Sequence, residues 1–524
     1  MSAFILSLSA ASVNRRVGAY APKRISDKVK SRLQILFGKD ILEKNASAFS
    51  SGRSAEKLHF LRKEEYPMNS AFDTYFTGLK NKKIAVLGLG VSNRPLVRLL
   101  LEYGCNVVGC DRTPREKLDA EVLELEAMGC RLHVGDGYLD DVEADILFRT
   151  PGMHPNSPAI ETLRSRGAEV TSEMEAFFEV CPCRIIAVTG SDGKTTTTTL
   201  IAKILEHAGH RVWVGGNIGA PLLPQAAEMT PADIAVVELS SFQLMTMERS
   251  ADIAVVTNVA PNHLDVHKDM AEYVQAKKNV FEYQNETGKV VLNYDNDITR
   301  GFAADAKGTV KFFSRLARPE NGVYLEDGVI YRNGKKIMAA ADIRIPGVHN
   351  IENYMAAACA VEGLAEDEDI DEIARTFAGV EHRIEFVREL DGVKYYNDSI
   401  ASSPSRTIAG LHSFRQKLVL IAGGYDKKIP FDALGPEICA HVRLLILCGA
   451  TAEKIEAAVK SAPNYLNGQP EILHAQTLEE AVRLAKQYTV PGDIVTLSPA
   501  CAAFDQFKNF MVRGETYKTL VQGL

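Results

Sequence analysis

The sequence predicts three consecutive α/β domains that follow an N-terminal extension. Strand and helix patterns alternate from Lys83 to the C-terminus. Many of the strands are near-continuous apolar runs, which are typical of parallel sheets covered on both faces. The length of 524 residues exceeds what one hydrophobic core usually organises. We therefore expect Rossmann-like domains over 71–181 and 380–524, with a central domain of the P-loop ATPase type over 182–379.

Residues 1–70 differ in composition from the rest of the chain. They contain 13 Lys and Arg against 6 Asp and Glu, a surplus of seven positive charges, and show little periodicity. The arginines of MSAFILSLSAASVNRR follow the apolar segment, whereas a signal peptide has its positive charges first. We expect a disordered extension or a start codon assigned too early, with Met68 as the initiator.

The composition excludes several classes of partner. The 67 Asp and Glu residues outnumber the 60 Lys and Arg residues, for a net charge of −7, and no basic stripe indicates nucleic-acid binding. No apolar run reaches the roughly 18 residues of a membrane span. Nine scattered cysteines, with Cys181 and Cys183 in C-x-C spacing, are typical of reduced cytosolic thiols. We expect a cytoplasmic monomer that binds small molecules, without nucleic-acid or membrane partners.

The first domain opens with a βαβ pattern, KKIAVLGLGVSNRPLVRLLLEYGCNVVGCD. Gly88 and Gly90 provide the tight turn of a dinucleotide fingerprint, but Asn93 occupies its third glycine position. Asp111 ends the second strand, where an acid can meet a ribose or a base. A lone G-x-G is weak evidence for NAD, so the nucleotide of this domain stays open at this point.

The stretch AVTGSDGKTTTTTLIAKIL predicts a phosphate-binding loop between a strand and a helix. Gly190 and Gly193 let backbone N–H groups turn toward an anion, and the N-terminus of the following helix favours negative charge. Lys194 can reach the outer phosphates and Thr195 can offer its hydroxyl to Mg²⁺. The loop is a variant, because Val188 stands where a standard P-loop has its first glycine. Of the next four threonines, we expect only Thr196 to add a hydroxyl.

Two further side chains follow buried strands of the same domain. Glu238 ends one strand and His263 comes shortly after the next, so both can converge on the loop. The H-x-D-x-H spacing from His263 does not fit a helical zinc site, and a hard cation beside ATP is favoured. Lys277 lies in a helical stretch and, on the residues alone, is a solvated lysine.

Six strings resemble the signatures of the Mur ligase family, in the family's order: TGSDGKTT, GGNIG, ELSSFQL, PGVHNIEN, EHRIE and YYNDS. The resemblance covers about residues 83–517. LSPACAAFDQFKNFMVRG and IAGGYDKKIPF are similar to the members that add D-glutamate, and the DNPR string of diamino-acid-adding members is absent. The resemblance implies an ATP-dependent amide ligase of peptidoglycan synthesis. Its first domain would bind UDP-N-acetylmuramoyl-L-alanine, its second ATP and its third D-glutamate. The resemblance also implies an acyl-phosphate intermediate.

The resemblance assigns site residues position by position. For ATP it implies Gly190, Ser191, Asp192, Gly193, Lys194, Thr195, Thr196, Asn350, Asn353, Arg383 and Asp398. For Mg²⁺ it implies Thr195, Glu238, His263 and Lys277, the last as a carbamate, which reverses the interpretation of Lys277 from the residues alone. The implied catalytic residues are Lys194, His263, Lys277 and Arg383. For the UDP substrate it implies Ser92, Asp111, Arg112 and Asn217.

The amino-acid pocket departs from the family at two positions. The resemblance implies that Ser402, Lys427 and Phe510 hold D-glutamate. Ile400 stands where better-known members have lysine, and Ala503 where they have serine. We therefore expect more backbone N–H contacts to the glutamate. The alternatives are another Mur-type or folylpolyglutamate-type amide ligase, a non-catalytic nucleotide-sugar-binding regulator and, on the G-x-G alone, an oxidoreductase.

Overall fold

The computed structural model describes residues 70–261, 266–426 and 429–524. The chain divides into two units, Met1–Met68 and Asn69–Leu524, and the described residues belong to the second. The predictions about residues 1–70 therefore lie almost wholly outside the described residues. Within the described part, no helix has both the length and the apolar character needed to cross a membrane.

The N-terminal sheet contains five parallel strands in the order β3-β2-β1-β4-β5. Its strands are β1 (Lys83–Leu87), β2 (Asn106–Asp111), β3 (Arg131–Val134), β4 (Ile146–Phe148) and β5 (Glu169–Thr171). Its helices are α6 (Ser70–Gly78), α7 (Asn93–Glu102), α8 (Ala120–Ala127), α9 (Pro158–Ser165) and α10 (Glu173–Val180), with the short η1 (Arg115–Lys117). Alternate residues of β1 belong to different clusters of the core, which confirms that both faces of the sheet are covered.

The central sheet contains nine strands in the order β14-β13-β12-β11-β10-β9-β6-β8-β7. They are β6 (Arg184–Thr189), β7 (Val212–Gly216), β8 (Ile234–Glu238), β9 (Ile253–Val256), β10 (Lys289–Asn293), β11 (Thr309–Ser314), β12 (Gly322–Glu326), β13 (Val329–Arg332) and β14 (Lys335–Ala339). In this spatial order, the strands from β12 through β6 to β7 are all parallel. The stretch GVYLEDGVIYRNGKKIM predicts a hairpin-like segment, and it forms the antiparallel pairs β12–β13 and β13–β14.

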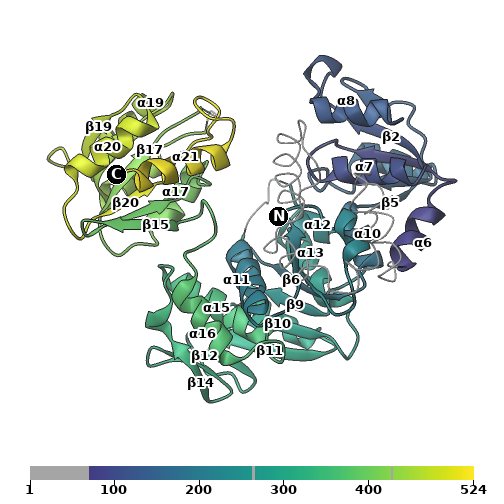
Figure 1. Cartoon of the computed structure of the whole chain (residues 1–524), viewed down its shortest axis with the longest axis horizontal. Coiled ribbons are helices and arrows are strands. Elements are labelled where there is room, and N and C mark those ends of the chain that lie inside the picture. Colours follow the sequence, from purple (N-terminus) through teal and green to yellow (C-terminus); the bar gives the residue numbers. More distant parts are fainter. Residues whose placement is uncertain (1–69, 262–265, 427–428) are drawn as a thin grey trace, which may run out of the picture. The chain divides into compact units, whose positions relative to one another are not determined.

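Helices flank the central sheet. They are α11 (Lys194–His207), α12 (Ser241–Leu244), α13 (Met270–Glu282), α14 (Asp297–Gly301), α15 (Val348–Ala360) and α16 (Asp367–Thr376), with the short η2 (Leu223–Glu228), η3 (Phe302–Ala304) and η4 (Ala340–Asp342). Figure 1 shows α11 and α15 side by side on this sheet. The run Ala356–Ala358 is buried, so small side chains let α15 approach its neighbours closely.

The C-terminal sheet contains six strands in the order β15-β16-β20-β17-β18-β19. They are β15 (Glu385–Leu390), β16 (Val393–Asn397), β17 (Leu418–Ala422), β18 (Val442–Leu447), β19 (Glu471–His474) and β20 (Ile494–Leu497). Only β15 runs antiparallel to its neighbour. The runs GVKYYNDS, KLVLIAGG, RLLILCG and DIVTLSPA predict four strands, which correspond to β16, β17, β18 and β20. The strands β15 and β19, at the two edges of the sheet, were not predicted.

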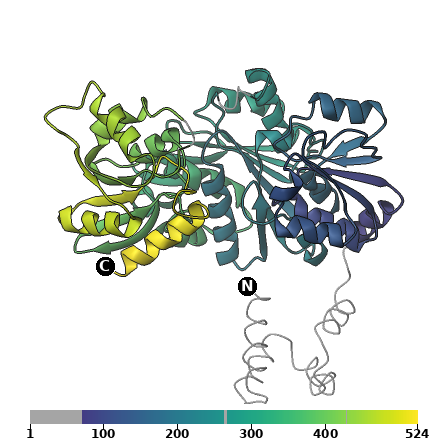
Figure 2. The same cartoon turned by 90° about the horizontal axis from the view of Figure 1, so that it is seen from above.

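The helices of the C-terminal domain lie on both faces of its sheet (Figure 2). They are α17 (Pro404–Leu411), α18 (Leu434–His441), α19 (Ala452–Lys460), α20 (Leu478–Tyr488) and α21 (Phe510–Gln522). Leu418 and Leu420 of β17 belong to the cluster of α17, α18 and α19, while Val419 and Ile421 belong to that of α20 and α21. The prediction of successive α/β domains built on parallel sheets is confirmed.

Candidate functional site

The predicted phosphate loop connects β6 to α11 and requires both of its glycines. Gly190 has φ +146° and Gly193 has φ +79°, in the region that glycine favours. A Cβ on Gly190 would lie 1.9 Å from Thr257 Oγ1, and one on Gly193 would lie 2.5 Å from Asn353 Oδ1. The close packing around the loop therefore excludes any side chain at these two positions.

Neighbouring segments hold the loop from outside. Ser191 Oγ lies 2.9 Å from both the Ala260 carbonyl oxygen and the Tyr273 hydroxyl. The Asp192 backbone N–H donates to Asn258 Oδ1 over 3.0 Å. The hydroxyl of Ser191, predicted as an ATP contact, is thus engaged in bracing the loop, and Asn258 and Tyr273 are bracing residues that the sequence did not reveal.

Lys194 begins α11 and folds back over the loop. Its Nζ donates to the carbonyl oxygens of Gly190 and Ser191, each over 3.0 Å. Burial lowers the pKa of Lys194, although the nearby Glu238 opposes the shift. A phosphate bound beside Lys194 would favour the charged form of the lysine and so counteract the effect of burial.

Glu238 ends β8 next to the loop and is only 1 % exposed. Its Oε1 accepts a hydrogen bond from Asn217 Nδ2 over 2.8 Å, whereas Oε2 is buried and has no hydrogen-bond partner among the described residues. Leaving such an oxygen unsatisfied costs about 1–3 kcal/mol. A divalent cation would satisfy it, so this residue fits the expected metal site. Asn217, predicted to contact the UDP substrate, orients this carboxylate.

Lys277 lies on α13 and is only 1 % exposed, so its interpretation as a solvated lysine is wrong. Its Nζ donates to the Gly190 carbonyl oxygen over 2.7 Å and lies 4.6 Å from the centre of the Tyr273 ring. No ion pair of the described residues gives it a carboxylate. Burial lowers its pKa well below the usual lysine value, and the charge of Lys194 adds to the shift. Burial therefore favours the neutral form of the amine that faces the phosphate loop.

Asn350 and Asn353, predicted as ATP contacts, are linked to α11 through a threonine. Thr197 Oγ1 donates to Asn353 Oδ1 over 3.2 Å, and Asn353 Nδ2 donates to Asn350 Oδ1 over 3.0 Å. The threonine run thus does more than start α11, because Thr197 links α11 to α15. Thr199 bonds the Thr195 carbonyl oxygen over 2.8 Å within the helix, and Thr195 itself is half-buried. Thr196 is buried, 8 % exposed.

His263, the remaining predicted metal ligand, lies outside the described residues. His267, from the same H-x-D-x-H string, is buried. Its Nε2 lies 2.8 Å from Ser241 Oγ, and its ring stacks on Phe242 at 5.3 Å. In the described structure His267 thus packs against the segment that follows Glu238.

The predicted residues of the C-terminal domain lie around β15 and β16. Arg383 sits between His382, with φ +64°, and Ile384, with φ +44°. Such left-handed conformations cost non-glycine residues free energy and cluster at functional sites. Asp398 is buried, accepts from Ser498 Oγ over 2.7 Å and from the Ile384 N–H over 3.3 Å. Burial raises the pKa of Asp398 to about 7.

Phe510 and Ser402, predicted for the amino-acid pocket, lie on separate segments of the chain. Phe510 starts α21 and packs edge-on against His382 at 5.9 Å, while Ser402 is half-buried before α17. Lys427 lies outside the described residues. Arg513, which the sequence did not single out, is buried and donates to the carbonyl oxygens of Ser399, Ala502 and Cys501. It joins the two loops that border the predicted pocket.

The comparisons with known proteins agree with this arrangement. Residues 188–361 match the Mur ligase middle domain, and residues 382–501 match the Mur ligase glutamate ligase domain. The chain is 52 % identical over 464 residues to the UDP-N-acetylmuramoylalanine–D-glutamate ligase of Acetivibrio thermocellus, covering 87 % of this chain and 100 % of that one. The same-named ligase of Clostridium botulinum is 48 % identical, with the same coverage of both chains. The chain belongs to the Mur ligase family.

A solved structure shares the fold. The crystal structure of UDP-N-acetylmuramate–alanine ligase from Thermotoga maritima has a TM-score of 0.53 to this Mur ligase, at 17 % sequence identity. It covers 84 % of this chain and 100 % of that one. At this identity the likeness supports the fold alone.

The broken fingerprint of this Mur ligase has a structural reason. Asn93, in the third glycine position, is buried, and its Nδ2 donates to the carbonyl oxygens of Leu87 and Gly88 over 3.0 and 2.9 Å. The asparagine side chain thereby fixes the turn through two hydrogen bonds that a glycine could not make. The turn is specific to this amide, which argues against a standard dinucleotide fingerprint.

Asp111 is positioned by backbone N–H groups. Its carboxylate accepts from the Leu89 and Thr113 N–H groups over 2.7 and 2.8 Å. Burial opposes the charge, but these hydrogen bonds outweigh it and lower the pKa of Asp111. Ser92 and Arg112 are exposed. The backbone hydrogen bonds thus fix the Asp111 carboxylate at the end of β2 and favour its charged form.

Arg149 is a buried contact that sequence reasoning missed. It follows β4, is 1 % exposed, and its Nη2 donates to the Phe242 carbonyl oxygen over 2.8 Å and to Thr246 Oγ1 over 2.9 Å. Arg149 lines a small cavity of about 40 Å³ with Ser92, Glu173 and Gln243. The cavity places a predicted UDP-substrate residue near the segment that follows Glu238.

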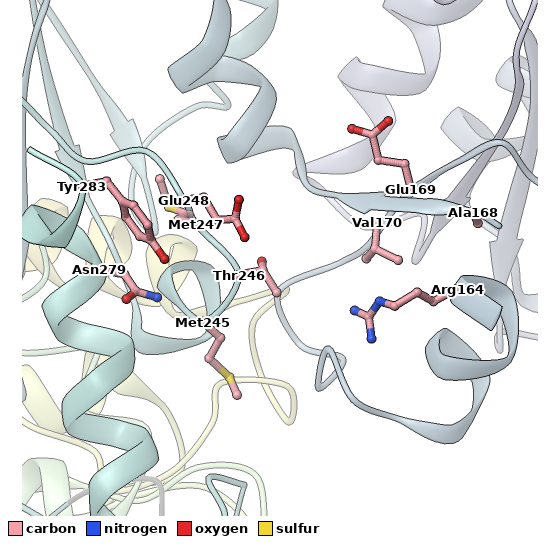
Figure 3. A pocket seen from close by; sticks show the side chains of 10 residues that line it. All are labelled: Arg164, Ala168, Glu169, Val170, Met245, Thr246, Met247, Glu248, Asn279 and Tyr283. Carbon is pink, nitrogen blue, oxygen red and sulfur yellow. The ribbon is translucent and has the colours of Figure 1, made fainter.

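A larger pocket of about 480 Å³ lies elsewhere (Figure 3). Its lining residues are Arg164, Ala168, Glu169, Val170, Met245, Thr246, Met247, Glu248, Asn279 and Tyr283. None of them is a predicted site residue. The candidate site of this Mur ligase is therefore the phosphate loop with Glu238 and Lys277, not this pocket.

Proposed function

We propose that this Mur ligase catalyses the ATP-dependent addition of D-glutamate to UDP-N-acetylmuramoyl-L-alanine in peptidoglycan precursor synthesis. One observation carries the proposal: the phosphate loop, the unsatisfied Oε2 of Glu238 and the buried amine of Lys277 meet at one edge of the central sheet. The names of the 48–52 % identical relatives support the choice of substrates. We further propose that the enzyme acts as a cytoplasmic monomer.

The first step activates a carboxylate. An oxygen of the substrate's alanine carboxylate attacks the γ-phosphorus of ATP, a P–O bond forms, and the bond to the leaving ADP breaks. Negative charge gathers on the transferred group, so positioned cations stabilise the transition state. Lys194 and the N–H groups at the start of α11 provide that stabilisation, and Arg383 adds a charge from the C-terminal domain.

The second step forms the amide. The neutral amine of D-glutamate attacks the acyl carbon of the acyl phosphate, a C–N bond forms, inorganic phosphate leaves, and the amine loses a proton. Ser402, Lys427 and Phe510 are proposed to hold the glutamate, and Ser92, Asp111 and Arg112 the UDP part. Asn350, Asn353 and Asp398 are proposed to position the adenine side of ATP.

Thr195, Glu238, His263 and a modified Lys277 are proposed to hold Mg²⁺, which neutralises phosphate charge when bound. Glu238 fits this role through its unsatisfied oxygen. Asn217 holds Oε1 of Glu238 through a hydrogen bond, so Oε2 is the oxygen left for the metal.

Lys277 is proposed to carry a carbamate. A neutral lysine nitrogen attacks CO₂, an N–C bond forms and a proton is released, which turns the neutral amine into an anionic carbamate. Burial favours the neutral amine that this reaction requires, because it lowers the lysine pKa. The carbamate would supply the carboxylate that Lys277 lacks among the described residues.

The carbamate is tested with neighbouring lysines. Lys277→Ala is expected to lose activity and to regain part of it with short carboxylates such as formate. The matched control is Lys278→Ala, because Lys278 follows on the same helix and is paired with Glu282 at 3.3 Å and Asp305 at 3.0 Å. Full activity of Lys277→Ala, or no rescue, would contradict the assignment.

The reaction is tested by phosphate release from ATP and UDP-N-acetylmuramoyl-L-alanine with D-glutamate, L-glutamate, L-lysine or diaminopimelate. We expect activity with D-glutamate and none after Lys194→Ala. Activity only with another amino acid would overturn the substrate, and no turnover with any of them would favour a nucleotide-sugar-binding regulator.

A further inference from the structure

Three ligand-type side chains of the C-terminal domain meet at the ends of two helices. His412 caps the C-terminus of α17, while Glu437 and His441 lie one turn apart on α18. His412 Nε2 lies 2.7 Å from Glu437 Oε2, and His441 Nε2 lies 3.5 Å from the same oxygen. The two imidazole rings are 4.9 Å apart. Nothing in the proposed reaction uses these residues.

The three side chains stand on a rigid base. Leu411, Ile438 and Val442, which adjoin the cluster in sequence, are fully buried or nearly so. The side chains of Glu437 and His441 are about one-third exposed and that of His412 is half exposed, so solvent reaches the cluster. The backbone positions are therefore held by the core while the ligand atoms stay accessible.

A comparison within the same domain shows why this cluster is distinctive. Glu381, His382 and Glu515 also lie close together, but Lys518 Nζ is 2.7 Å from both glutamates and already supplies a cation. Among the ion pairs of residues 70–261, 266–426 and 429–524, Glu437 pairs only with His412 and His441. One carboxylate oxygen thus receives two imidazoles and no lysine or arginine.

We propose that His412, Glu437 and His441 form a binding site for a divalent transition metal, with zinc as the preferred ion. All three ligand atoms lie within 4.8 Å of one another. Ligands about 2.0–2.1 Å from a tetrahedral zinc are about 3.3 Å apart, so the 3.5 Å separation already fits and the 2.7 Å separation needs a small opening. Two imidazoles and one carboxylate suit zinc, whereas Mg²⁺ and Ca²⁺ prefer oxygen ligands.

The site would join two helices that carry different parts of the domain. α17 begins after the loop that contains Ser402, and α18 leads directly into β18. A metal bound by His412 at the C-terminal end of α17 and by Glu437 and His441 of α18 would fasten α17 to α18 at the end opposite that loop. The exposed side leaves a fourth position for water, as zinc with three protein ligands commonly has.

Zinc titration of the full-length protein tests the site. Calorimetry is performed with ZnCl₂ under reducing conditions and in excess Mg²⁺, which occupies the proposed ATP-site metal position. Wild-type protein is compared with His412→Gln and His441→Gln, which change an exposed and a partly exposed side chain. The control is His474→Gln, because His474 is similarly exposed and pairs with Glu456, which Lys460 also contacts.

We expect wild type and His474→Gln to bind one equivalent of zinc with the same affinity. The affinity of His412→Gln and of His441→Gln for this zinc should be at least tenfold lower. The affinity should fall as the pH is lowered, because zinc must displace protons from the imidazoles. Equal binding by all four proteins, or no zinc binding by wild type beyond that of the cluster variants, would overturn the proposal.

Discussion

Glu238→Gln should raise the stability of the metal-free central domain while it abolishes most activity. The substitution keeps the shape of the side chain and the acceptor for Asn217 Nδ2, but it removes the charge of a buried group whose Oε2 has no described partner. An unsatisfied buried polar atom costs about 1–3 kcal/mol, more when charged. A neutral amide still leaves one polar atom unpaired, so we expect a net gain of about 1 kcal/mol.

Trp213 makes this gain measurable in one domain. It is the only tryptophan of the chain, lies on β7 opposite Ala235 of β8, and its Nε1 donates to Asp233 over 2.9 Å. Its fluorescence therefore reports unfolding of the central domain. A gain of about 1 kcal/mol corresponds to a rise in Tm of about 2–4 °C for a domain of this size.

The assay combines thermal unfolding in a metal chelator with phosphate release in Mg²⁺. The control is Glu206→Gln, which alters an exposed glutamate on α11 and should change neither quantity. A clear loss of stability in Glu238→Gln would refute the reasoning, because it would mean that Oε2 had a favourable partner. Full activity would refute the metal role of Glu238.

Three other substitutions probe the remaining domains. Arg513→Leu should destabilise the C-terminal domain by about 3 kcal/mol or more in denaturant unfolding, because it strands buried carbonyl oxygens, whereas Arg483→Leu at an exposed helix position should have little effect. Asp398 has a folded pKa of about 7, raised above its unfolded value near 4, so the folded domain binds more protons in that window. Stability should therefore fall as the pH rises from 4 to 7, by up to about 1.4 kcal/mol per pH unit. Asp398→Asn should remove this dependence on pH, and an unchanged dependence would contradict the burial of Asp398. Asn93→Gly restores the G-x-G-x-x-G spacing but deletes the hydrogen bonds to Gly88 and its neighbour, so we expect a loss of about 1–3 kcal/mol and no NADH binding by fluorescence.

Much of the fold was readable from local patterns. The apolar strands of the parallel sheets, the order of glycines, lysine and threonine before α11, and the hairpin of β12 to β14 depend on residues that are close in sequence. The edge strands β15 and β19 were missed because their half-buried residues lack a clear alternation or apolar run. The motifs that resemble the Mur ligase family were also visible as short strings.

The sequence by itself determined which chemical groups are available, and the tertiary structure decided their states. Lys277 looks solvated in its own helix, and only packing against the distant Gly190 carbonyl and Tyr273 ring buries it and lowers its pKa. Likewise, the orientation of Glu238 depends on Asn217, from a different strand end. Burial and hydrogen-bond partners arise from contacts between residues far apart in the chain, so no local pattern encodes them.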